Sequence, residues 1–240
     1  MKQMMERYEI FQPFIPRRHS SLRKVLGALL FFFLVASCTS DSYEKGTGQY
    51  SLMRADMAEM RSDADSRAVS FTTDDGDVYS LTSPMALKWM TTPDSIYRVQ
   101  IYYNKVSDDK AEAVGVGLVP TMRPIEHWRI KNAKEDPVDV ESAWVAKSKR
   151  YLNLGLLFKT GRIDDEEGVH GIGIVQDTVL VSPGGKRTAC YRFLHDQGDT
   201  PEYYTNRHFV SILLPDELPD TVKLGINTYQ GIVEQQFALQ

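Results

Sequence analysis

The sequence has few of the features that would fix an activity or a covalent framework. It contains only two cysteines, Cys38 and Cys190, so one intrachain disulfide is the most it can form. It has no Gly-x-Ser-x-Gly elbow and no His-Glu-x-x-His pair, which excludes the hydrolase classes that those motifs define. The apolar run at 25–36 has twelve residues, and a membrane-spanning helix needs about 20. Stability must therefore come from a buried core, and this run is not predicted to cross a membrane.

The one strong motif is built around that apolar run. A basic cluster precedes it, and the run closes with Val-Ala, followed by Ser37 directly before Cys38. Basic, apolar and then small residues are the layout of a secretion signal. A cysteine after Val-Ala-Ser resembles the lipobox of bacterial lipoproteins. That resemblance implies diacylglycerol on the thiol of Cys38, cleavage before it and acylation of the new amino terminus; an ordinary cleavable signal with a chance cysteine is the alternative.

This interpretation divides the chain into a lipoprotein signal peptide at 1–37 and 203 residues from Cys38 onward, of which residues 38–48 form a polar tether. The membrane then becomes a partner through the N-terminal lipid, because two or more acyl chains hold a protein stably on a bilayer. The first 37 residues carry six of the 28 basic and two of the 32 acidic residues, so the rest carry 22 and 30. A net charge of −8 argues against nucleic acid as a partner.

After the tether, the dominant signal is the alternation of apolar and polar residues that is typical of β-strands. The first half predicts strands at 49–57, 68–73, 77–81, 96–106 and 113–119, with a tight hairpin at Asp75-Gly76 and a short helix at 83–90. The second half predicts strands at 138–144, 151–158, 170–176, 178–181, 188–194, 208–214, 222–229 and 232–239. Short strands separated by regular turns are typical of a sandwich.

These marks resemble the NigD-like lipoproteins of Bacteroides-type bacteria. The marks are the tether leading into Gly48-Gln49-Tyr50, the Asp75-Gly76 hairpin, Asp136-Pro137-Val138 leading to Trp144, and the closing strand pair around Gly225-Ile226-Asn227. The resemblance implies an all-β chain with a small OB-like barrel at 49–122, a connection at 123–137 and an immunoglobulin-like, antiparallel β-sandwich at 138–240. It carries no enzyme activity onto these residues.

No residue is predicted to be catalytic, and no metal site or cofactor is predicted. The acidic run at 164–167 could supply oxygen ligands for calcium, but it lacks the alternating spacing of a calcium loop, so a solvated hairpin tip is preferred. The four histidines after residue 100 are never three to five residues apart, and only residues distant in sequence could converge. Cys190 is predicted to be a buried, inert thiol.

Aromatic side chains are the remaining candidates for binding. Trp89, Trp128, Tyr203 and Tyr204 lie near predicted loops or strand ends, where exposed rings could stack on sugars. The alternative is that each ring fills a core or a domain junction. Trp144 follows apolar residues at even spacing and is predicted to belong to the core.

Three functions remain open at this point. The favoured one is an outer-membrane lipoprotein without catalysis that binds a glycan or an envelope protein, with the periplasmic or cell-surface face undecided. The second is an immunity or accessory protein of a bacteriocin system. The third is a secreted glycan-active hydrolase with two facing carboxylates.

Overall fold

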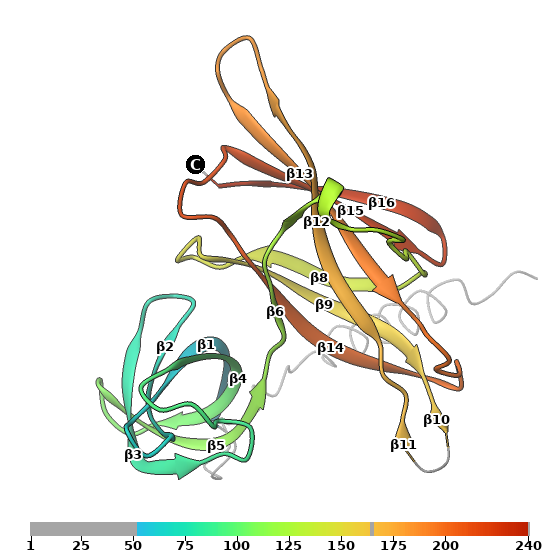
Figure 1. The fold of residues 1–240 in the computed structure, drawn as a ribbon. Helices are drawn as coiled ribbons and strands as arrows, with labels where there is room; N and C mark the ends of the chain where they lie inside the picture. The colour runs from blue at the N-terminus through green and yellow to red at the C-terminus, as the bar shows by residue number, and fades with distance from the viewer. Residues whose placement is uncertain (1–51, 164–165, 240) are drawn as a thin grey trace, which may run out of the picture. The chain divides into compact units, whose positions relative to one another are not determined.

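A computed structural model describes residues 52–163 and 166–239, and these residues fold almost entirely as β-strands (Figure 1). Cys38, the predicted signal peptide and the tether lie outside the described residues. In the described part, no helix is long and apolar enough to cross a membrane. The strands form a closed five-stranded barrel, a five-stranded sheet and a four-stranded sheet, together with one two-stranded hairpin.

The first five strands make the barrel. They are β1 (Arg54–Ser62), β2 (Arg67–Thr73), β3 (Val78–Ala86), β4 (Ile96–Lys105) and β5 (Lys110–Leu118). Their order is β1-β2-β3-β5-β4, closed by the β1–β4 pair, and only β3 and β5 run parallel. This five-stranded closed arrangement is OB-like, as predicted.

The barrel core is aromatic. Phe71, Tyr79 and Tyr103 are at most 2% exposed, and their ring centroids lie 5.0–5.4 Å apart. Alternation along β4 turns Val99, Ile101 and Tyr103 inward. The Asp75-Gly76 hairpin is also confirmed, since Gly76 has a φ of 95° and donates its N–H to the carbonyl oxygen of Thr73.

The remaining strands pack as a sandwich around one core. One sheet has the order β16-β15-β13-β12-β7 and the other β6-β14-β9-β8. Most neighbours are antiparallel, but β13–β15, β12–β7 and β14–β6 are parallel. The strands are β6 (Thr121–Met122), β7 (Ile125–Glu126), β8 (Asp139–Val145), β9 (Tyr151–Thr160), β12 (Gly171–Val181), β13 (Arg187–Asp196), β14 (Tyr204–Leu213), β15 (Thr221–Thr228) and β16 (Gly231–Ala238).

Some predicted boundaries differ from the structure. The segment at 83–90 is not a helix, because β3 continues through Pro84 and pairs Met85 and Ala86 with β2. The strands predicted at 170–176 and 178–181 are one strand, β12, with a bulge between Gln176 and Thr178. The first strand lies later than 49–57, at Arg54–Ser62. The short hairpin β10 (Arg162–Ile163) and β11 (Glu166–Glu167) flanks Asp164 and Asp165, which lie outside the described residues.

The passage from barrel to sandwich is more structured than a plain connection. The barrel ends with β5 at Leu118, and β6 already pairs with β14, so the predicted boundary at 122 lies within the sandwich. The predicted connection at 123–137 contains β7, which pairs with β12, and the 3₁₀ turn η1 (His127–Arg129). Through β6 and β7, the chain therefore adds one short strand to each sheet of the sandwich before β8 begins.

Candidate functional site

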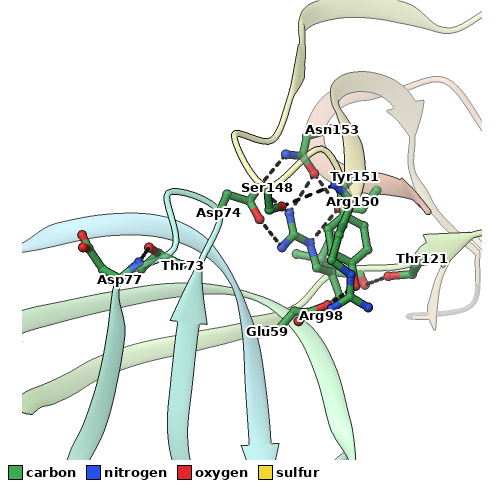
Figure 2. A network of polar contacts seen from close by, with 12 residues as sticks. Glu59, Thr73, Asp74, Asp77, Arg98, Thr121, Ser148, Arg150, Tyr151 and Asn153 are labelled. Atoms are coloured by element: carbon green, nitrogen blue, oxygen red, sulfur yellow. Dashed lines mark hydrogen bonds and ion pairs between the residues drawn. The ribbon is translucent and has the colours of Figure 1, made fainter. Parts of the chain in front are cut away.

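A buried arginine lies where the barrel meets the sandwich. Alternation along β4 turns Arg98 away from the barrel core, yet the residue is only 5% exposed. Its Nη1 and Nη2 atoms donate to the two carboxylate oxygens of Asp74, each over 2.6 Å (Figure 2). Asp74 begins the β2–β3 hairpin, so the hairpin turn delivers the carboxylate to the guanidinium. This two-point geometry is the strong form of an ion pair.

The sandwich supplies the other partners of Arg98. Asn153 of β9 and Ser211 of β14 are both fully buried. Nη2 of Arg98 donates to Oδ1 of Asn153 over 2.9 Å, and Nε donates to Oγ of Ser211 over 3.1 Å. Asn153 also donates from Nδ2 to Asp74 over 2.9 Å. Each buried polar group thus has a partner, and removing one would leave the others unsatisfied.

Tyr151 covers this network. The Arg98 guanidinium lies 4.0 Å from the centre of the Tyr151 ring, a cation–π contact. The Tyr151 hydroxyl donates to Glu59 of β1 over 2.6 Å, and Glu59 is also paired with Arg150 at 2.8 Å (Figure 2). Burial, together with the bond to Glu59, raises the pKa of Tyr151 to about 12. The barrel and sandwich are therefore held by a polar junction of residues from both.

Beside the junction lies an open cleft of about 330 Å³. Trp144 and Phe209 of the sandwich form one wall, and their rings meet edge to face with centroids 6.0 Å apart. Gly155 makes room for this wall, because a Cβ there would lie 2.5 Å from Oγ of Ser142 and 3.1 Å from the Phe209 ring. The barrel supplies the other lining residues: Ala55, Asp56, Met57, Asp74, Asp75 and Gln100.

The cleft combines carboxylates with aromatic rings. Both oxygens of Asp74 are occupied by Arg98, while Asp56 accepts a hydrogen bond from the Tyr103 hydroxyl over 2.8 Å. Burial beside Asp56 raises the pKa of the Tyr103 phenol well above its ordinary value. Asp75 is exposed at the hairpin tip. Rings and acceptor oxygens suit a sugar or a cationic group such as a lysine or arginine side chain.

Trp144 was predicted to belong to the core, and that prediction is wrong. A bulge between Val140 and Ser142 shifts the alternation of β8, so Ala143 and Val145 pack on the core. Trp144 is consequently half-buried and lines the cleft. An even-spacing argument fails wherever an extra residue interrupts a strand.

The four aromatic residues predicted for binding lie in three different parts of the described chain. Trp89 is half-buried against the barrel core, with its ring centroid 5.7 Å from that of Tyr97. Trp128 lies on η1 and is 66% exposed. Tyr203 and Tyr204, 78% and 42% exposed, lie at the start of β14. Their role in binding stays a prediction, while Cys190 is half-buried rather than buried.

Histidines distant in sequence do converge. His170, His195 and His208 surround Phe158, with ring centroids 5.0, 5.2 and 5.9 Å from the Phe158 ring. Nδ1 of His170 lies 3.0 Å from Nε2 of His195, and Nδ1 of His195 lies 3.1 Å from the Asp136 carbonyl oxygen. A carbonyl oxygen only accepts, so neutral rings require N–H at Nδ1 of both histidines. This leaves Nε2 of His170 as a buried acceptor without a partner among the residues that the structure describes.

This cluster predicts a pH-dependent stability. Burial, with His195 and His208 nearby, lowers the pKa of His170 below its ordinary 6.5. The unfolded chain therefore binds more protons than the folded one just below pH 6.5, so the free energy of unfolding should fall as the pH drops from 6.5 toward the folded pKa. Urea unfolding at pH 7.5 and 5.5 should show a smaller loss for His170→Gln than for the wild type. An equal loss in both proteins would contradict the assignment.

The described residues contain no group of three or more histidine, cysteine or acidic side chains that could hold a metal ion. The barrel, the sandwich and the cleft at their junction define a class of small all-β proteins. In comparisons with known proteins, no protein-family model matches the chain, and no curated protein matches it.

Solved structures do match. A NigD-like immunity protein from Bacteroides caccae superposes with a TM-score of 0.59 and 22% identity over 77% of this chain and 97% of that one. A protein from Parabacteroides distasonis described as toxin-related gives 0.55 and 18% over 77% and 92%. A Bacteroides fragilis protein described as a lipoprotein gives 0.57 and 12% over 78% and 98%. The predicted resemblance to NigD-like proteins is confirmed in the fold.

Proposed function

We propose that this chain is a lipid-anchored accessory protein of the bacterial cell envelope that acts by binding and not by catalysis. The observation that carries the proposal is Cys38, placed directly after Val-Ala-Ser at the end of a basic-then-apolar leader. The fold shared with a protein described as a lipoprotein supports it. The outer membrane is the proposed location.

The junction cleft is the proposed binding site. It is open to solvent, its Trp144–Phe209 wall comes from the sandwich and its carboxylates come from the barrel, so a ligand there would touch both domains. The Arg98 network would hold the two walls at a fixed separation, which lowers the ordering cost of binding. A glycan or an envelope protein are the ligands this lining would suit.

A specific observation favours the immunity alternative as a second candidate. One structural neighbour is described as a NigD-like immunity protein and another as toxin-related. The net charge of −8 after residue 37, with Asp56 and Asp75 at the cleft, would favour a basic partner through electrostatic steering. In this version, the partner would be a basic toxin segment.

Site-specific photocrosslinking in cells tests the cleft. A benzophenone amino acid in place of Gln100, which lines the cleft, should yield one discrete adduct whose mass spectrum identifies the partner. The same group in place of Leu180, 55% exposed on β12, is the matched control and should yield at least fivefold less of that adduct. A common adduct at both positions, or none at Gln100, would contradict binding in the cleft.

A further inference from the structure

The five-stranded sheet of the sandwich ends in an unusually open edge. In the described part of the chain, β16 pairs with β15 alone, over all eight residues of Gly231–Ala238 and without a bulge (Figure 1). Such an edge offers a row of free N–H and C=O groups to another strand. Natural proteins normally protect such an edge from pairing with another chain.

Among the described strands, the barrel is closed and has no edge. The short strands β6 and β7 each cover only two residues of β14 and β12, which are therefore edges over most of their length. Strand β12 is interrupted by the bulge between Gln176 and Thr178, and the uncovered part of β14 carries a charged residue, Arg207. The remaining long edge strand, β8, is interrupted by the bulge between Val140 and Ser142. Closure, short length and bulges are the ordinary protections against edge pairing. Strand β16 has none of them.

The sequence of β16 also lacks protection. It reads Gly-Ile-Val-Glu-Gln-Gln-Phe-Ala, with no proline, lysine or arginine. Its one charge, Glu234, is paired with Lys223 of β15 over 2.9 Å. Ile232 and Val233 are 73% and 39% exposed. This strand is therefore built to pair rather than to repel.

We propose that β16 pairs antiparallel with β16 of a second copy of this chain, around a two-fold axis at Gln235, so that the two five-stranded sheets become one. A two-fold axis perpendicular to the sheet keeps the faces of both copies aligned. Two residues directly opposite each other must then have their side chains on the same face of the sheet. This requires one residue to lie opposite its own copy at the axis, because a register shifted by one residue would turn every side chain to the other face. The two central registers place the axis at Glu234 or at Gln235.

The side chains select Gln235. An axis at Glu234 sets two Glu234 carboxylates directly opposite each other, which destabilises a strand pair. An axis at Gln235 sets Val233 opposite Phe237 twice and Glu234 opposite Gln236 twice. Phe237 already packs against the sandwich core, half-buried, and Val233 shares its face of the strand. The second copy's Val233 would thus extend the core across the axis.

This inference goes beyond the proposed function and does not require the lipid anchor. Anchoring on one membrane would nevertheless favour the pair, because it raises the effective concentration of each copy for the other. An isologous contact of this kind closes on itself and leaves no further β16 edge exposed. Pairing therefore protects an edge that the described strands leave unprotected.

Cysteine crosslinking of the full-length chain in cells tests the register. In a Cys190→Ser background, Gln235→Cys places the two introduced thiols on opposing residues, whose Cα atoms lie about 4.5–5.5 Å apart in such a pair, within the range a disulfide bridges. Mild oxidation should then give a dimer band on a non-reducing gel. Glu234→Cys is the matched control, since its two copies are offset by two residues, and it should give at least tenfold less dimer.

The outcomes are distinct. A Gln235→Cys dimer with little Glu234→Cys dimer supports the proposed axis, and Val233→Lys added to Gln235→Cys should reduce that dimer at least fivefold. Equal crosslinking at both positions, or none at position 235, overturns it. The Cys190→Ser parent must stay monomeric; a dimer there would arise from an unlipidated Cys38 and would count against the anchor, not against the β16 pair.

Discussion

Arg98→Leu should lower the free energy of unfolding by about 3–5 kcal/mol, the range found when one partner of a buried ion pair is removed. The substitution leaves the carboxylate of Asp74 and the amide of Asn153 without their main partner at a buried junction. For a chain of this size, the loss corresponds to a decrease in melting temperature on the order of 10 °C. Urea and thermal unfolding followed by circular dichroism measure both quantities.

The control is the same substitution at an exposed arginine of the barrel. Arg61→Leu in β1 should change the free energy of unfolding by less than about 0.5 kcal/mol, as is usual for surface sites. Trp89 lies in the barrel and Trp144 in the sandwich. A variant that retains one of them as its only tryptophan therefore reports, by fluorescence, on the unfolding of that part. In Arg98→Leu the two reporters should unfold at separate midpoints. Coincident midpoints and a loss below 1 kcal/mol would show that the network does not couple the domains.

Cys38→Ala should move the protein from the membrane fraction to the soluble envelope fraction almost completely. The physical reason is that each buried methylene of an acyl chain contributes about 0.8 kcal/mol, so the chains on Cys38 account for nearly all of the membrane affinity. Fractionation with a salt wash, followed by immunoblotting, measures the shift. Cleavage at the lipobox requires the modified cysteine, so the variant is made behind a leader that ordinary signal peptidase removes. An uncleaved leader would itself bind the membrane through the apolar run at 25–36.

Cys190→Ala is the matched control for this experiment. Cys190 lies half-buried on β13, far along the chain from the leader, and its loss should leave fractionation unchanged. If Cys38→Ala stayed with membranes through a detergent-free salt wash, another attachment would have to hold the chain. The lipid-anchor proposal would then be wrong.

Local patterns predicted much of the fold because they depend on neighbours in sequence. The Asp75-Gly76 turn requires a positive φ at Gly76, and it is a hairpin in the structure. Alternation located the strands of the sandwich to within a few residues. These features follow from backbone sterics and side-chain direction, which a single sequence carries.

Features that depend on distant partners could not be predicted. Alternation along β4 turns Arg98 away from the barrel core, but only the arrival of Asn153 and Ser211 from the sandwich buries it. The bulge in β8 reversed the expected side of Trp144, and no residue near it signals the bulge. The pairing of β6 with β14 joins positions about 90 residues apart. The cleft, which these contacts form, was therefore not visible in the sequence.

The most direct test of the lipid-anchor proposal is the mass of the N-terminal peptide of the protein purified from membranes of the cells that make it. The account predicts that the peptide begins at Cys38 and carries a diacylglyceryl group and an N-linked acyl chain. A peptide that begins elsewhere, or an unmodified thiol at Cys38, would contradict it.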